Sequence, residues 1–337
     1  MTDAQSVAVT GAAGLLGQHV CRSLLGRGAT VRAMVHRSSD RTLPADLAAT
    51  VQVQAGDVRD ADSLERAFAG VDAVVHCAAR VIVEADSEGL ADATNASGTA
   101  NVIEACIASG VSRLVHMSSV HAFGPLRGTR LHRNSPLALG SRIPYCASKA
   151  MAHRHVLQEA AAGRLDTTVV CPGALVGPGD TVPTPVGEML LQLAAGRIPC
   201  FIDEGYWWSD PRDVAEVVAS AAGRKTNPGA ERVYFTLGRF EKLAGLARLC
   251  SRILGRNLER PVVPVAFALA GLPFLQFYAT LRRQPPLYTR NSLHLVRECP
   301  ADVDHGTAEM ELGYVRRPLE HSVRDALQSF QDRGMLA

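Results

Sequence analysis

The stretch SVAVTGAAGLLG, residues 6–17, decides the fold of this chain. The apolar run SVAVT predicts a buried strand, and the residues after the glycines predict a helix that runs to Gly26. Gly11 permits a tight turn, Gly14 lets the backbone approach a ligand, and Gly17 allows close packing of helix on strand. Because a helix N-terminus attracts phosphate, this order predicts a dinucleotide site; the alternative is a glycine-rich turn without a ligand. The residues predicted to contact the dinucleotide here are Gly11, Ala13, Gly14, Leu15, Leu16 and Gly17.

Short β-branched runs alternate with helical patterns over the first half of the chain. This alternation predicts an α/β fold with a Rossmann-type, doubly wound parallel sheet. Such sheets bind ligands beyond the carboxyl ends of their strands, so functional residues should follow the strands directly. The expected strands after the first are 30–35, 51–55, 73–76, 114–117 and 167–171, and the expected helices are 14–26, 62–68 (capped near Asp62 or Ser63), 94–109 and 145–162.

The composition of the sequence changes after Pro172, where proline and glycine become frequent and the alternation of strands and helices is lost. We therefore expect a smaller, irregular C-terminal lobe that binds the substrate. Residues 1–172, with returning segments near 200–240, are predicted to form the dinucleotide-binding domain, and residues 173–337 mainly the substrate-binding lobe.

Composition excludes several classes of function. The net charge is +2, and the 35 basic residues form no contiguous block, so we expect no nucleic-acid partner. The eight cysteines form no CxxC pair or metal-ligand spacing, so no metal site is predicted. The N-terminal residues lack the basic and apolar pattern of a signal peptide, and we expect a cytoplasmic protein.

One segment, residues 261–281, is apolar and carries no charge, and it lies between Arg260 and Arg282-Arg283. Its length reaches the roughly 20 residues that a membrane span needs, but Pro264 and Pro273 disfavour a continuous helix. Three interpretations stay open: a span, a peripheral contact with a membrane, or an apolar helix or lid of the substrate lobe.

The end of the second strand selects the nicotinamide cofactor. An acidic residue there would bind the ribose 2′-hydroxyl of NAD, whereas an arginine suits the 2′-phosphate of NADP. The sequence at 31–37 is VRAMVHR, with no carboxylate before Asp40. The side chain of Arg37 therefore favours NADP(H) over NAD(H), unless Arg37 is only a solvated loop residue.

Two further strand ends offer residues for the cofactor. Asp57 and Val58 follow the third strand, where the Asp57 carboxylate could lie near the adenine amino group. Ala78 and Ala79 follow the fourth strand and are small enough to let the cofactor pass closely. Ordinary packing at a strand end is the alternative for both pairs.

Tyr145 and Lys149 are four residues apart on a predicted helix, so their side chains lie on one face of it. A phenol is a poor proton-transfer group at neutral pH, and a neighbouring ammonium would lower its pKa. Ser119 follows a predicted strand and could donate a hydrogen bond to a substrate oxygen. These three residues together predict transfer of a proton beside the transfer of a hydride.

With these motifs in place, the chain resembles the extended short-chain dehydrogenases/reductases. It is most similar to the branch that holds 3β-hydroxysteroid dehydrogenases, dihydroflavonol-4-reductase-like proteins and bacterial ketoreductases. The motifs that carry the resemblance are TGAAGLLG at 10–17, VRAMVHR at 31–37, GDVRD at 56–60, VVHCAA at 74–79, TNASGTANVIEAC at 94–106, VHMSSVHAFG at 115–124, YCASK at 145–149, CPGALVGPGD at 171–180 and AEMELGYVRRPLEHSVRDAL at 308–327.

The resemblance implies roles for particular residues. It selects Ser119 rather than Ser118 as the catalytic serine, and it gives Asn95 a part in supporting the lysine. It also places Pro172 beside the nicotinamide and matches Asp213 to an acidic turn residue of the family.

The substrate is the least determined part of the interpretation. The aromatic residues of 261–281, and with them Trp207 and Trp208, suit a hydrophobic substrate better than a sugar nucleotide, although such residues are more often core. His121 lies two residues after Ser119 and is expected to affect specificity at most.

We therefore expect an NAD(P)H-dependent oxidoreductase acting on a ketone or secondary alcohol of a hydrophobic molecule such as a steroid, polyketide or β-keto acid. One alternative is a sugar-nucleotide epimerase or dehydratase on the same scaffold. Another, from a different class, is a non-catalytic dinucleotide-binding or sensor protein. The resemblance further implies a homodimer.

Overall fold

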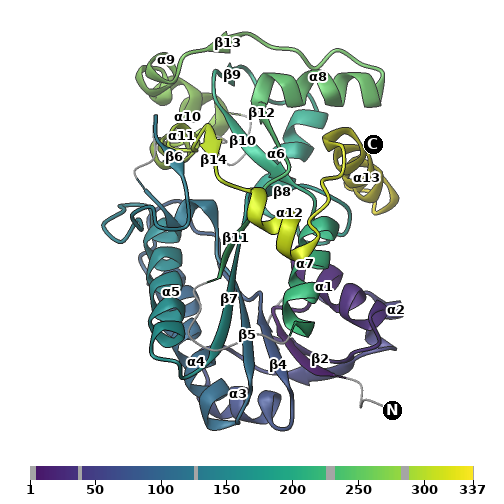
Figure 1. Ribbon diagram of the computed structural model, residues 1–337. Helices are drawn as coiled ribbons and strands as arrows, with labels where there is room; N and C mark the ends of the chain where they lie inside the picture. Colours follow the sequence, from purple (N-terminus) through teal and green to yellow (C-terminus); the bar gives the residue numbers. More distant parts are fainter. Residues whose placement is uncertain (1–4, 37–39, 125–127, 225–231, 282–287, 337) are drawn as a thin grey trace.

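A computed structural model describes residues 5–36, 40–124, 128–224, 232–281 and 288–336 (Figure 1). Its main feature is a seven-stranded sheet in the order β11-β7-β5-β4-β1-β2-β3, in which every neighbouring pair is parallel. The predicted doubly wound, Rossmann-type sheet is confirmed. The strands are β1 (Ser6–Thr10), β2 (Thr30–Val35), β3 (Gln52–Ala55), β4 (Ala73–His76), β5 (Arg113–Met117), β7 (Asp166–Pro172) and β11 (Val233–Thr236).

The order of the strands reverses at β1, and this reversal locates the binding crevice. Thr10, the last residue of β1, pairs with Met34 of β2 on one side and with His76 of β4 on the other. The strands before and after this point extend the sheet in opposite directions from β1. The helices that connect the strands of the two halves therefore lie on opposite faces of the sheet and leave a crevice between them.

Helices cover both faces of this sheet and bury its apolar residues (Figure 1). The period-2 pattern of the strands sends alternate side chains to the two faces, so two separate apolar clusters form. One face packs against α3 (Ala61–Phe68), α4 (Gly98–Ala108) and α5 (Pro144–Ala161); the other packs against α1 (Leu15–Gly26), α2 (Ala45–Ala48), α7 (Pro211–Gly223) and α12 (Gly306–Leu312).

Two predicted helices differ from the structure at their first turn. Helix α3 is capped by Asp60, not by Asp62 or Ser63, because the Ser63 hydroxyl instead donates to backbone carbonyls. The expected helix 94–109 begins as a π-helix, Asp92–Ser97, before α4. The Thr99 hydroxyl donates to the carbonyl oxygen of Asn95 over 2.5 Å, which competes with regular α-helical hydrogen bonding there.

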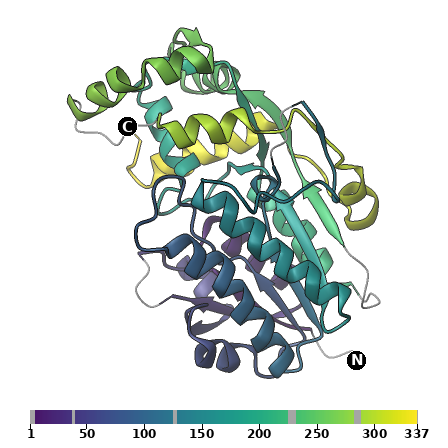
Figure 2. The ribbon, with the colours of Figure 1, turned by 90° about the vertical axis from the view of Figure 1, so that its left-hand side faces the viewer.

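The upper lobe in Figures 1 and 2 is built from short strands and helices around a third apolar cluster. Its material comes mostly from the second half of the chain, while α7 and β11 return to the large sheet. The remaining elements are a 3₁₀ turn (Val120–Ala122), β6 (Arg130–Leu131), β8 (Ala174–Leu175), α6 (Pro185–Ala194), β9 (Phe201–Ile202), β10 (Gly205–Ser209), β12 (Arg239–Lys242), α8 (Leu243–Leu254), β13 (Val262–Val263), α9 (Val265–Ala270), α10 (Leu272–Leu281), α11 (Arg290–Arg297), β14 (Asp302–Val303) and α13 (Leu319–Asp332).

The apolar segment 261–281 is divided among β13, α9 and α10. Pro264 precedes α9, and Gly271 separates α9 from α10, so the segment does not form one continuous helix. Within the described residues, none of the helices combines the length and apolarity that crossing a bilayer requires.

Candidate active site

A cavity of about 790 Å³ extends from the carboxyl ends of the parallel strands into the upper lobe. The glycine turn after β1 lines one end, and side chains of α8 and α11 line the other. The cavity therefore joins the site predicted for a dinucleotide to a second, largely apolar compartment. The residues that the sequence predicted and that line this cavity are Gly11, Ala13, Gly14, Leu15, Leu16, Gly17, Asp57, Val58, Ala78, Ala79, Ser119, His121, Tyr145, Lys149, Pro172 and Trp208.

Trp207 is a predicted site residue that the structure places elsewhere. Its indole nitrogen donates to the carbonyl oxygen of Pro300 over 2.8 Å, and its ring packs against Phe240. Trp207 and Trp208 are neighbours on β10, so their side chains point to opposite faces and only Trp208 lines the cavity. Arg37, on which the prediction of NADP rested, lies outside the described residues.

Asp213 also lies away from the cavity lining. It stands in the first turn of α7, where its carboxylate accepts hydrogen bonds from the backbone and the guanidinium of Arg317. Its role in the structure is to hold the C-terminal segment against the end of α7.

The glycine turn fits the diphosphate of a dinucleotide. Gly11 has a φ of 66°, and a Cβ atom there would lie 2.7 Å from the backbone nitrogen of Ala78. A Cβ atom on Gly17 would lie 2.2 Å from the carbonyl oxygen of Gly11. Helix α1 has neither a side-chain cap at Gly14 nor an acidic residue in its first turn, so its N-terminus can receive an anion.

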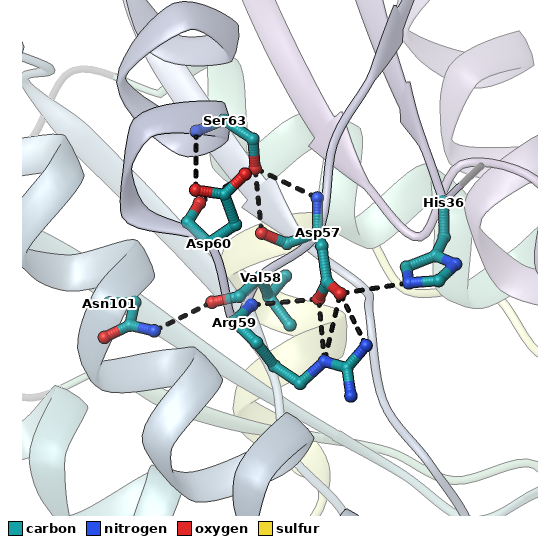
Figure 3. A network of polar contacts seen from close by, with 7 residues as sticks. All are labelled: His36, Asp57, Val58, Arg59, Asp60, Ser63 and Asn101. Carbon is teal, nitrogen blue, oxygen red and sulfur yellow. Dashed lines mark hydrogen bonds and ion pairs between the residues drawn. The ribbon is translucent and has the colours of Figure 1, made fainter. Parts of the chain in front are cut away.

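The loop after β3 fixes a carboxylate in the wall of the cavity (Figure 3). Asp57 accepts hydrogen bonds from the guanidinium of Arg59 and from Nε2 of His36. The hydrogen bonds from Arg59 hold the pKa of Asp57 well below its usual range. The Asn101 side chain donates to the carbonyl oxygen of Val58 and ties this loop to α4. The loop is thus held in place before any ligand binds.

Tyr145, Lys149 and Ser119 meet in the middle of the cavity. Pro144 starts helix α5, and the four-residue spacing places Tyr145 and Lys149 on one face of it. The Ser119 hydroxyl acts on the Tyr145 hydroxyl as a hydrogen-bonding neighbour and favours its phenolate form. The Lys149 ammonium donates to the carbonyl oxygen of Met117, the last residue of β5, over 2.7 Å. Helix α5 and strand β5 therefore both contribute polar atoms to this cluster.

Burial controls the protonation of this group. It raises the pKa of Tyr145 to about 12, although the hydrogen bond with Ser119 acts in the opposite direction. It lowers the pKa of Lys149 to about 8, because the ammonium is removed from water. The lowered pKa that we expected for Tyr145 is wrong, since desolvation outweighs the hydrogen bonding that favours phenolate. Tyr145 is consequently a protonated phenol at neutral pH.

Asn95 is fully buried but does not line the cavity. Its side-chain amide exchanges two hydrogen bonds with the backbone of Arg80 and donates a third to the Ser148 hydroxyl. Ser148 in turn donates to the carbonyl oxygen of Tyr145. Asn95 is therefore a positioning residue that joins the loop after β4 to helix α5, and the expected contribution to catalysis is indirect.

Three buried histidines behind Lys149 were not found from the sequence. His76 of β4 bonds to Thr10 over 2.7 Å, and His153 of α5 bonds to Ser118 over 2.8 Å. The ring of His116 lies 5.4 Å from that of His76. Burial lowers the pKa values of His76 to about 3 and of His153 to about 4, and the charge of Lys149 acts in the same direction. His76 and His116 gave no signal beyond a polar residue in an apolar strand, and His153 gave none beyond a polar residue in a helix.

The far compartment of the cavity is aromatic and aliphatic. His121 lies at its entrance beside Tyr206, with an interplanar angle of 82°, and burial lowers the pKa of His121 to about 4. The His121 ring is therefore neutral at pH 7 and cannot donate a proton as an imidazolium. Further residues that line this compartment, missed by the sequence interpretation, are Leu193, Ile198, Phe201, Ile202, Leu243, Leu246, Tyr288, Leu295 and Val296.

This combination of glycine turn, strand ends and Ser-Tyr-Lys group agrees with comparisons against known proteins. Residues 7–234 match the model of the NAD dependent epimerase/dehydratase family. The chain belongs to this family. It is the group of extended short-chain dehydrogenases/reductases that the motifs predicted, so the chain is an NAD-dependent dehydrogenase or reductase.

Several similar proteins cover nearly the whole chain, and two relatives and one solved structure are described here. Sterol demethylase protein B of Methylococcus capsulatus is 32% identical over 97% of this chain and 99% of its own length. The 4-hydroxy-2-methyl-3-oxo-4-farnesyl-3,4-dihydroquinoline-1-oxide ketoreductase of Stigmatella aurantiaca is 28% identical over 97% of this chain and 96% of its own. The crystal structure of gox2253 is 30% identical, with a TM-score of 0.84 over 99% of this chain and 100% of that one.

Proposed function

We propose that this family member is a ketoreductase: it uses a nicotinamide cofactor to reduce a ketone of a hydrophobic small molecule, and in reverse oxidises the alcohol. One observation carries the proposal. Tyr145 and Ser119 lie inside one cavity between the glycine turn of β1 and the apolar compartment of the upper lobe. A carbonyl held beside Tyr145 would have a dinucleotide site on one side and an apolar wall on the other.

The roles of Ser119, Tyr145 and Lys149 in the reaction follow from the protonation states of these side chains. The Ser119 and Tyr145 hydroxyls donate hydrogen bonds to the carbonyl oxygen and polarise it. A bound nicotinamide supplies the hydride for reduction or accepts it in the reverse direction. Tyr145, a protonated phenol below its pKa of about 12, transfers its proton to the oxygen as negative charge develops there. The Lys149 ammonium then favours the phenolate that remains.

The apolar compartment supports a hydrophobic substrate such as a steroid, polyketide or β-keto acid. Its walls are formed by leucine, isoleucine and phenylalanine side chains of the cluster that fills the upper lobe. Two of the full-length relatives are named for a sterol and for a farnesyl-bearing quinoline oxide, which are both large and apolar. A sugar nucleotide would leave its hydroxyl groups without partners against these walls.

NADP(H) is the proposed cofactor. Strand β2 ends at Val35 and is followed by His36, so neither residue offers a carboxylate for a ribose 2′-hydroxyl. Two arginines, Arg41 and Arg59, line the same cavity as His36. The carboxylate of Asp57 is already engaged by Arg59 and His36, which limits its repulsion of a 2′-phosphate.

The test is a panel of apolar ketones, including 3-ketosteroids, with NADH and NADPH assayed separately. Tyr145→Phe should lower kcat on the order of 10²–10⁴-fold, because it removes only the proton donor. Tyr234→Phe is the matched control, since the Tyr234 hydroxyl bonds to Glu311 and does not line the cavity. Turnover that survives Tyr145→Phe undiminished, or turnover of UDP-sugars alone, would refute the proposal.

A further inference from the structure

Large apolar side chains are exposed on residues 262–281, which form β13, α9 and α10 of the upper lobe. Phe274, Phe277 and Leu281 lie on α10 at the spacing of one helix face, and they are 80%, 70% and 71% exposed. Phe267 of α9 is 72% exposed, and Val262 of β13 is 47% exposed. Scattered apolar residues are normal on protein surfaces, but here five occur within 20 residues. We call these five residues the patch.

The same part of the chain carries a strong positive charge. Eight arginines and a single glutamate occur between Leu243 and Arg297, although the whole chain has a net charge of only +2. Arg248 and Arg252 lie four residues apart on α8, and both are exposed. Figure 1 shows α8, β13 and α9 along the outer end of the upper lobe, away from the large sheet. Arg248 and Arg252 of α8 thus lie at the same end of the molecule as Val262 and Phe267 (Figure 1).

The inner side of this segment packs behind the cavity wall. Val265, Ala268 and Leu272 are buried in the apolar cluster that also contains the cavity residues Phe201 and Tyr288. β13 pairs with β9, whose two residues both line the cavity. Helices α9 and α10 therefore stand between the apolar compartment and the outside, with apolar side chains on both of their sides.

We propose that the outer surface of β13, α9 and α10, together with the arginines of α8, docks on an anionic lipid bilayer. The phenylalanines would enter the interface between headgroups and acyl chains, and the arginines would lie among the lipid phosphates. This surface brings the apolar compartment next to the bilayer, so the ketone substrate is one that partitions into lipid. The choice of substrate source rests on the proposed function; the docking does not.

A second copy of the chain is a poorer occupant of this surface. A symmetric dimer formed through the patch would place the two arginine-rich segments against each other. Like charges that meet across a desolvated interface oppose association, and no acidic cluster occurs in this stretch to compensate for them. Lipid phosphates supply the opposite charge, and acyl chains supply the apolar partner.

The experiment is co-sedimentation of the full chain with vesicles of phosphatidylglycerol and phosphatidylcholine in equal parts, and with vesicles of phosphatidylcholine alone. Binding to the anionic vesicles should be stronger and should weaken in high salt. The variant Phe267→Ser/Phe274→Ser/Phe277→Ser should lose on the order of tenfold or more in affinity, and Arg248→Ser/Arg252→Ser roughly tenfold. The control Met310→Ser/Val315→Ser changes residues that are equally exposed, 80% and 76%, outside the patch.

Wild-type protein that ignores the anionic vesicles, or a triple variant that binds as well as the control, would overturn the proposal. Loss of a dimer in the triple variant, without vesicle binding by the wild type, would assign the patch to self-association instead. Turnover of a water-soluble ketone separates the two proposals. We expect the triple variant to retain it, whereas wild type that binds vesicles but reduces no ketone would refute only the ketoreductase function.

Discussion

Replacing Lys149 by methionine should stabilise the fold while it destroys activity. Lys149 is 4% exposed, and burial lowers its pKa from 10.5 to about 8. At about 1.4 kcal/mol per unit of pKa, the buried ammonium costs the folded state about 3 kcal/mol. Methionine avoids this cost, but it leaves the carbonyl oxygen of Met117 without its hydrogen bond, at about 1 kcal/mol. Lys149→Met should therefore raise the free energy of unfolding by about 2 kcal/mol at pH 7.

The pH dependence of the free energy of unfolding checks the sign of this effect independently. Because the pKa of Lys149 is lower in the folded state, the unfolded chain binds the proton more tightly. The cost is complete below about pH 8 and is lost as the pH rises toward 10.5, the ordinary value. At pH 9.5 it falls to about 1 kcal/mol, so the advantage of Lys149→Met should nearly vanish there.

Urea unfolding at both pH values, together with ketone reduction at pH 7, measures stability and activity in the same variants. Lys242→Met is the matched control, because Lys242 is exposed and paired with Asp203, so its stability should change little. A Lys149→Met protein that is less stable than wild type at pH 7, or whose advantage grows with pH, would refute the reasoning. So would retention of full reductase activity.

Three more substitutions test the cavity. Gly11→Ala should cost about 2–5 kcal/mol in urea unfolding and abolish cofactor binding, because the new Cβ meets the backbone of Cys77 and Ala78, directly after β4. Gly28→Ala, with a φ of 80° and no neighbour within 4 Å, should cost only about 1–2 kcal/mol of backbone strain. Arg41→Ala should raise KM for NADPH roughly tenfold and leave KM for NADH unchanged, whereas Arg22→Ala, at a surface ion pair, should alter neither. Asn95→Leu should lower the free energy of unfolding by about 2–4 kcal/mol and reduce kcat, and an unchanged kcat would contradict its positioning role.

The sequence by itself determined the parts of this protein that depend on local patterns. The glycine turn at 11–17 and the alternation of strands and helices predicted the sheet, and the four-residue spacing predicted that Tyr145 and Lys149 share a helix face. These features could be found because each needs only neighbouring residues, with a fixed period or a fixed backbone conformation.

Tertiary structure decided what depends on contacts between distant segments. It separated Trp208, in the cavity, from its neighbour Trp207, and it placed Asn95 behind the site rather than in it. It also decided the pKa of Tyr145, since burial by segments of both lobes reversed the shift expected from Lys149 alone. Desolvation depends on every element that packs around a group, and no spacing within the sequence contains that information.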